Sequence, residues 1–236
     1  MLSAFLRSSF LRSSILDKGL VLIWIIVQVI LLIHFGVNTG LEAEKYTSAA
    51  IYFAETSSLP EPKYFFYSFP IFVIYLFNQI GLGPEGVVFF QIILNGVATI
   101  LLYKLTYNLT SKRQIAQIAS ILFIFFLPLQ TWNVYLYTES IFISLTIIFT
   151  HIIFKYPPFS FKNFLIPIPV LFLLILTRPF GLLFIIPYVI YAIIFATKNF
   201  RRLLIIISIF AIALFSYLIN YAFNGGGDMD AMKPFI

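Results

Sequence analysis

The chain has 236 residues, of which 61% are hydrophobic and only 10% are charged. An ordinary soluble domain has roughly 25% charged and 45 to 50% apolar residues, so this composition excludes a soluble globular protein and predicts an integral membrane protein. The absence of Cys and the presence of two His residues argue against disulfide scaffolds, thiol catalysis and Cys or His metal sites. The net charge of +6 is typical of basic cytoplasmic loops in a membrane protein, so no nucleic-acid partner is expected.

The first apolar run, Leu20 to Gly36, follows a basic stretch that contains Arg7, Arg12 and Lys18. No small-residue cleavage site follows it, so we interpret it as an uncleaved membrane anchor with a cytoplasmic N-terminus. Further apolar runs could each cross a membrane as one helix. They are Val87 to Leu105, Gln114 to Leu129, Ser140 to Phe154, Phe164 to Thr177, Gly181 to Thr197 and Leu203 to Phe223. The expected fold is therefore all-α and polytopic, with about seven transmembrane helices.

One more apolar run, Tyr64 to Ile80, decides which side of the membrane each later loop faces. If this run does not cross, eleven of the 15 basic residues and one of the nine acids lie on the cytoplasmic side, as the positive-inside rule predicts. We therefore predict a re-entrant or juxtamembrane segment, in which Pro60, Pro62 and Pro70 disrupt regular helix. The first outer loop then extends over about residues 37–86 and contains juxtamembrane helices.

No linker or fixed-period repeat divides the chain, so residues 1–236 are expected to form a single membrane domain. The segment Asn224 to Ile236 is polar and Gly-rich and carries Asp228 and Asp230. Such a loop is more typical of a connection between spans than of a terminus, so we expect the N-terminal part of a larger protein. The two aspartates are interpreted as flexible-loop charges, and no metal site is expected.

Ionisable side chains close to a membrane are costly to place, so those at the predicted outer face are candidates for chemistry. Glu42, Glu44 and Tyr46 follow the first span, in a sequence typical of the start of a short interfacial helix. Glu42 and Tyr46 would share one face of that helix. A carboxylate fixed there could act as a general base for an acceptor hydroxyl, and the alternative is a solvated loop charge.

Glu139 lies where an outer loop enters the next span, beside Tyr137 and Thr138. It is either a first-turn acid that the helix dipole favours or a functional carboxylate. In the second case the carboxylate, with Tyr137 and Thr138 beside it, would bind a sugar hydroxyl or orient the helix of Glu42. Arg178 separates two apolar runs, and it either snorkels to the interface or binds a lipid phosphate through its guanidinium fork.

With these residues in order, the chain resembles the N-terminal part of the GT-C superfamily of polytopic glycosyltransferases, which take sugars from polyprenyl-phosphate carriers. Two segments look most like the GPI-type mannosyltransferases for the second mannose and their bacterial relatives. They are Tyr-Thr-Glu-Ser-Ile-Phe at Tyr137 to Phe142 and Thr-Arg-Pro-Phe-Gly-Leu-Leu at Thr177 to Leu183. The resemblance covers roughly Leu20 to Phe223.

The resemblance implies a role for each outer residue. Glu42, with Glu44 as the alternative, would be the catalytic base, although the family usually has Asp there. Glu139 would be the second acid near the site, and Arg178 would contact the carrier phosphate. Tyr46, Tyr137 and Thr138 are expected to bind substrate or carrier.

The implied reaction moves a mannose-like hexose from a polyprenyl- or dolichyl-phosphate carrier to a hydroxyl of a glycan or lipid-linked acceptor on the non-cytoplasmic face. No cofactor is expected, and a divalent metal is optional because a lipid phosphate leaves readily. Two other functions stay open, a transporter or flippase of lipid-linked sugars and a non-catalytic subunit of a glycan-assembly complex. The compact, Ile- and Phe-rich, Cys-free chain favours a bacterial inner membrane.

Overall fold

The computed structural model describes residues 15–202 and 204–206. Within these residues the fold is all-α, as predicted, and ten α-helices alternate with three short 3₁₀ helices. The helices are α2 (Ile15–Phe35), α3 (Glu42–Thr56), η1 (Pro62–Tyr67), α4 (Ser68–Gln79), α5 (Gly83–Thr110), α6 (Arg113–Phe125), α7 (Leu127–Gln130), η2 (Thr131–Val134), α8 (Thr138–Lys155), α9 (Phe161–Leu165), α10 (Ile168–Thr177), η3 (Pro179–Phe184) and α11 (Ile185–Phe195).

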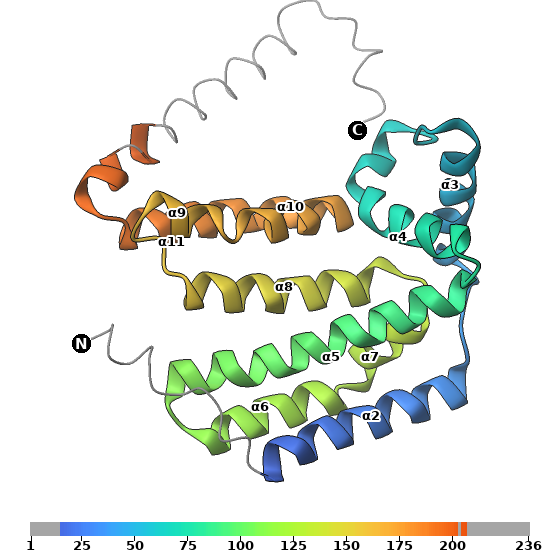
Figure 1. Cartoon of the computed structure of the whole chain (residues 1–236), viewed down its shortest axis with the longest axis horizontal. Coiled ribbons are helices and arrows are strands. Elements are labelled where there is room, and N and C mark those ends of the chain that lie inside the picture. The colour runs from blue at the N-terminus through green and yellow to red at the C-terminus, as the bar shows by residue number, and fades with distance from the viewer. Residues whose placement is uncertain (1–14, 203, 207–236) are drawn as a thin grey trace, which may run out of the picture.

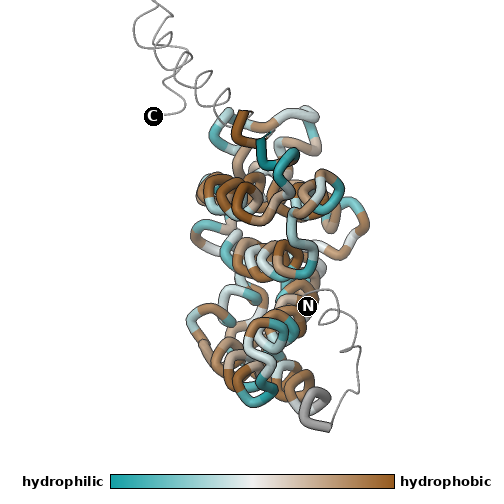
Figure 2. The backbone as a smooth tube through the Cα atoms, turned by 90° about the vertical axis from the view of Figure 1, so that its left-hand side faces the viewer, coloured by the Kyte–Doolittle hydropathy of each residue, from teal (hydrophilic) through white to brown (hydrophobic). Residues whose placement is uncertain are grey.

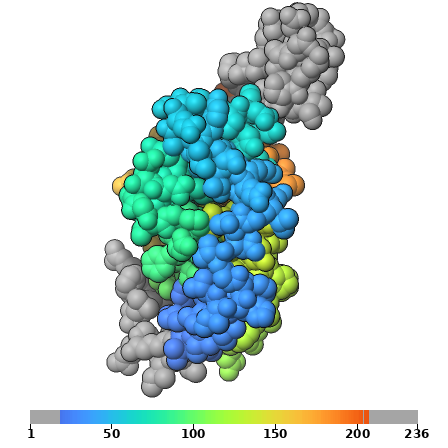
Figure 3. Space-filling model, turned by 90° about the vertical axis from the view of Figure 1, so that its right-hand side faces the viewer, coloured from blue at the N-terminus to red at the C-terminus, as the bar shows by residue number. Residues whose placement is uncertain are grey.

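The longer helices lie side by side with their axes roughly parallel (Figure 1). Helix α5 packs against both α6 and α8, while α2 packs against α6 and α10 packs against α8. Helices α3 and α4 pack together at one end of this stack, where α2 ends and α5 and α8 begin. We call this the α3–α4 end, and it faces the viewer in Figure 3.

The described residues contain two helices, α5 and α8, that are long and apolar enough to cross a membrane. A third candidate exists if α6 and the α7–η2 segment, which are bent by 62° relative to each other, form one broken span. The expectation of about seven full spans is therefore wrong for this part of the chain. The last expected span, from residue 203 to residue 223, lies almost entirely outside the described residues.

The missing spans are apolar helices that end too early. The apolar stretches Gly19–Phe35, Phe161–Thr177 and Pro179–Phe195 are helical but shorter than 18 residues. Proline interrupts the two later stretches, at Pro167 before α10 and at Pro179 at the start of η3, because it lacks a backbone donor and clashes with the preceding turn. Pro128 follows the bend between α6 and α7, and Pro167 precedes α10. The hydropathy of the sequence identifies these apolar runs, but it does not predict where the helix within each run ends.

The run from Tyr64 to Ile80 folds as the 3₁₀ helix η1 followed by the 12-residue helix α4. Twelve residues are too few to cross a bilayer, which agrees with the prediction that this run does not span. Helix α4 packs beside α3 at the α3–α4 end. The first-turn acids of α3, α5 and α8 lie at the same end. Lys112 precedes α6 and Lys155 ends α8 at the opposite end of the stack. The two ends therefore differ in charge as the positive-inside argument predicts.

Hydrophobic residues predominate along the helices, and hydrophilic residues recur at the turns (Figure 2). Large apolar side chains also point outward, including Ile33, which is 80% exposed, and Leu122, which is 67% exposed. Water would penalise such a surface, whereas lipid tails would not. The outer surface is thus suited to a membrane, while the fold places its ionisable residues at the two ends.

Candidate functional site

The candidate site is centred on an ion pair at the α3–α4 end. Arg178 Nη1 lies 2.6 Å from Glu139 Oε1, and the two side chains are 25% and 17% exposed. Glu139 belongs to the first turn of α8, where the helix dipole favours an acid, and Arg178 follows the last residue of α10. Both were predicted as site residues, and the fold brings them into direct contact.

Arg178 owes its position to a tight corner between α10 and η3. Its backbone is extended, its amide donates to the carbonyl of Leu174, and its carbonyl accepts from the amide of Gly181. A Cβ atom at Gly181 would lie 2.4 Å from the carbonyl carbon and oxygen of Leu174. Only glycine allows the chain to turn back this closely on α10, so Gly181 holds Arg178 at the helix end.

The guanidinium of Arg178 has a hydrogen-bond donor that the ion pair with Glu139 does not use. Its Nε is buried and has no hydrogen-bond partner within the described part of the chain, while Nη1 contacts Glu139. A buried donor without an acceptor is costly, and an arginine fork can bind a phosphate through two parallel donors. The geometry therefore leaves one donor of Arg178 without an acceptor.

Tyr46 connects α3 to this ion pair. It is 2% exposed, and its hydroxyl has Thr138 as a hydrogen-bond partner. Burial raises the pKa of Tyr46 to about 12. The hydrogen bond with Thr138 lowers this pKa, whereas the negative charges of Glu42 and Glu139 raise it further. The Tyr46 hydroxyl is thus neutral and interacts electrostatically with both acids. Helix α3 begins at Glu42, as predicted, and buries Tyr46 on its inner face.

The two candidate bases on α3 remain accessible. Glu42 is 53% exposed and forms a loose ion pair with Lys45, whose Nζ lies 3.8 Å from Glu42 Oε1. Lys45 also lies over the ring of Tyr46 at 5.3 Å and near that of Tyr67 at 6.0 Å. Glu44 is exposed and has no ion pair with any described residue. Lys45 is thus a cation beside the candidate base that the sequence analysis did not single out.

The segment before α8 is anchored by the chain that leaves α2. The amide of Asn38 donates to the carbonyl of Val134, and the amide of Leu136 donates to the carbonyl of Asn38. From α5, Gln91 Nε2 lies 2.7 Å from the carbonyl oxygen of Tyr135 and 3.2 Å from that of Asn133. These contacts fix the residues that lead directly into Thr138 and Glu139.

A buried network of amide side chains supports the same segment. Gln28 Nε2 donates to Gln130 Oε1 at 2.7 Å, and Asn133 Nδ2 donates to Gln28 Oε1 at 3.0 Å. Ser140 Oγ donates to Asn133 Oδ1 at 2.5 Å, and Gln130 Nε2 closes the bend by donating to the carbonyl of Phe123. All four side chains of the network are at most 3% exposed. The network joins α2, α7, η2 and α8.

The sequence analysis overlooked these network residues because they lie inside or beside apolar runs. A signal was present, since a polar amide in a membrane helix needs an internal partner. Gln28 interrupts the first apolar run, and Gln91 interrupts the second.

Five of the seven predicted site residues come together: Glu42, Tyr46, Thr138, Glu139 and Arg178. Glu44 points into solvent, and the ring of Tyr137 packs against that of Tyr135 at 5.3 Å. Residues 15–202 and 204–206 hold no group of three acids or histidines placed to bind a metal. Asp228 and Asp230 lie outside the described residues.

No protein-family model matches the chain, and neither a curated protein nor a solved structure matches it. The geometry of the site and the resemblance seen in the sequence are therefore the two grounds for a functional proposal.

Proposed function

We propose that this protein is a membrane glycosyltransferase that moves a mannose-like hexose from a polyprenyl- or dolichyl-phosphate carrier to an acceptor hydroxyl on the non-cytoplasmic face. One observation carries the proposal: a cation with an unpaired buried donor forms an ion pair with an acid, at the end of an apolar helix stack that also carries accessible carboxylates. The acceptor would be a glycan or a lipid-linked hydroxyl at the outer membrane surface.

The reaction requires a group that accepts a proton and a group that stabilises a leaving phosphate. The acceptor oxygen forms a bond to C1 of the sugar while the bond from C1 to the phosphate oxygen breaks, and that electron pair leaves with the carrier phosphate. Glu42 or Glu44 takes the hydroxyl proton, and both are exposed enough to reach an acceptor. A single displacement of this kind inverts the configuration at C1.

Arg178 stabilises the phosphate through the exposed guanidinium donors that Glu139 does not use. In this arrangement Glu139 is a positioning residue, because its carboxylate fixes the orientation of Arg178. Tyr46 and Thr138 hold α3 against the start of α8 and so keep the base and the cation on the same side of the substrate. The resemblance to GT-C enzymes supports the same assignment of base and cation.

The test is sugar transfer and donor binding by the purified chain in lipid nanodiscs, with radiolabelled polyprenyl-phosphate mannose. Glu42→Gln or Glu44→Gln should lower transfer by about 10²- to 10⁴-fold with donor binding intact, since general-base catalysis is worth this much. Arg178→Ala should lose donor binding. Glu55→Gln is the matched control, because Glu55 is an exposed acid on the same helix α3. Full activity in all three site variants would refute the assignment, and a wild type that neither binds nor transfers would refute the function.

One observation favours a transporter or flippase of lipid-linked sugars as the second candidate. The 62° break between α6 and α7, next to buried amides, is the kind of discontinuous helix that forms binding sites in transporters. Movement of a labelled lipid-linked sugar across proteoliposomes, without a transfer product, would favour this candidate. If the acids can be replaced without loss of either activity, a non-catalytic subunit of a glycan-assembly complex fits better.

A further inference from the structure

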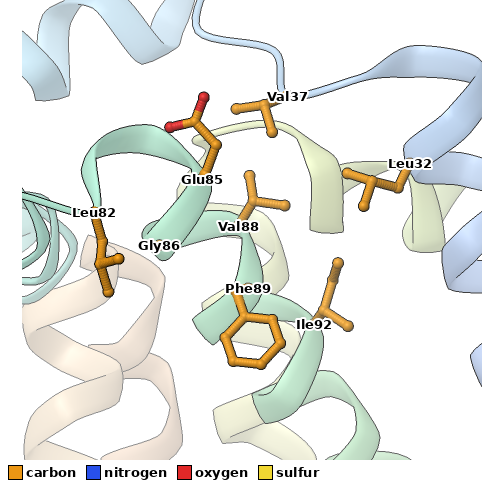
Figure 4. A pocket seen from close by; sticks show the side chains of 8 residues that line it. All are labelled: Leu32, Val37, Leu82, Glu85, Gly86, Val88, Phe89 and Ile92. Atoms are coloured by element: carbon orange, nitrogen blue, oxygen red, sulfur yellow. The ribbon is translucent and has the colours of Figure 1, made fainter.

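An apolar pocket of about 470 Å³ lies between α2 and α5 near the α3–α4 end. Its walls carry one ionisable side chain, Glu85, and otherwise only apolar residues and a glycine (Figure 4). They are Leu32, Val37, Leu82, Gly86, Val88, Phe89 and Ile92. None of these residues belongs to the ion pair of Glu139 and Arg178, so the pocket is separate from the candidate catalytic site.

The pocket exists because α2 and α5 are in close contact at one level and separate at another. Trp24 Nε1 donates to Asn95 Oδ1 at 2.9 Å, and a Cβ at Gly96 would lie 2.7 Å from the Trp24 ring. The two helices run in opposite directions, so Leu32 lies further along α2 and faces the earlier part of α5. There the side chains of the two helices line the pocket between them.

The distribution of charge along the pocket indicates what it binds. Figure 4 shows the Glu85 carboxylate at the end nearest Val37, while Phe89 and Ile92 lie at the opposite end. Glu85 is exposed, and no cation in the described part of the chain pairs with it. Phe89 is 64% exposed and Leu82 53%, so the apolar wall continues onto the surface that faces lipid tails.

We propose that this pocket binds one acyl chain of a lipid with a primary ammonium head group, such as phosphatidylethanolamine, and that Glu85 accepts hydrogen bonds from the ammonium. The volume suits part of one chain rather than a whole lipid. A carboxylate at the mouth attracts an ammonium and repels an anionic head group, including a carrier phosphate. The quaternary ammonium of phosphatidylcholine carries the same positive charge but has no N–H donor. Phosphatidylcholine is therefore the lipid against which the preference must be measured.

The test measures lipids that remain bound to the full chain, by native mass spectrometry after purification in detergent with equal amounts of phosphatidylethanolamine, phosphatidylcholine and phosphatidylglycerol. Wild type should retain phosphatidylethanolamine over phosphatidylcholine by about tenfold, the effect of one charge-assisted hydrogen bond. Glu85→Gln should abolish this preference. Glu55→Gln, which removes an exposed acid elsewhere at the same end, should keep it.

A second variant separates chain binding from head-group recognition. Leu32→Trp fills the pocket from α2, and Leu32 is already 39% exposed, so the substitution does not disturb the core. It should lower the retention of all three lipids. Equal retention of the three lipids by wild type, a preference for phosphatidylglycerol, or an unchanged preference in Glu85→Gln would each overturn the proposal. None of these outcomes depends on glycosyltransferase activity.

Discussion

The ion pair between Glu139 and Arg178 should couple the two residues energetically, and a double-mutant cycle measures that coupling. The variants are Glu139→Gln, Arg178→Gln and the double substitution. Two unit charges about 4 Å apart attract by about 4 kcal/mol at an effective dielectric constant near 20. Withdrawing both charges from water offsets part of this attraction. For side chains that are 17% and 25% exposed, we expect a coupling energy of about 2 kcal/mol.

The assay is unfolding by sodium dodecyl sulfate in mixed micelles, followed by the fluorescence of Trp24 and Trp132. Each single variant should lower the free energy of unfolding by about 2 to 3 kcal/mol, because it leaves its partner partly buried and unpaired. The double variant should lose little more than either single one.

The pair of Glu61 and Lys63 is the matched control for this cycle. Its atoms are 2.7 Å apart, nearly the same distance, but the side chains are 56% and 57% exposed. Solvent screening should bring its coupling to the limit of detection. Additive losses for Glu139 and Arg178, or equal coupling in the two pairs, would refute the reasoning that burial makes this pair strong.

Three further predictions concern the residues that surround the ion pair. Tyr46→Phe should change the pH dependence of stability: the unfolded chain releases this proton near pH 10, whereas burial raises the folded pKa to about 12. The wild type therefore loses stability between pH 10 and 12 that the variant keeps, and parallel curves over this range would contradict the burial of the hydroxyl. Asn133→Ala should lower the free energy of unfolding by about 2 to 3 kcal/mol, since Gln28 and Ser140 lose partners, whereas the exposed control Asn78→Ala should have little effect. Gly181→Ala should cost about 1 to 3 kcal/mol and weaken donor binding, because the added Cβ collides with backbone atoms of α10; unchanged thermal unfolding would show that the corner is less tight than described.

The sequence predicted the class of fold and most helix positions, because apolar runs and first-turn acids are local signals. Helix α3 begins at the predicted Glu42, and α8 begins beside the predicted Glu139. The number of spans was wrong because it depends on where each apolar run bends or breaks, as the run from Gln114 to Leu129 does beside Pro128 and the hydrogen bond from Gln130 to Phe123. A hydropathy count treats these residues as one continuous stretch.

The candidate site was predictable residue by residue but not as a contact. Glu139 and Arg178 were identified because each is an ionisable residue beside an apolar run. The sequence around either residue does not predict that the two side chains form a contact. Their contact depends on the packing of α10 against α8 and on the tight corner at Gly181. The pairing of Tyr46 with Thr138 likewise depends on how α3 folds back over the start of α8.

The hydrogen bond between Gln28 and Asn133 has a consequence for biosynthesis, because these residues are 105 positions apart in the chain. At a translation rate of 5 to 20 residues per second, Asn133 is made about 5 to 20 s after Gln28. An amide without a partner in hydrocarbon costs several kcal/mol, so α2 is poorly suited to enter the bilayer alone. The side chain of Gln28 therefore has no internal partner until Gln130 and Asn133 have been made.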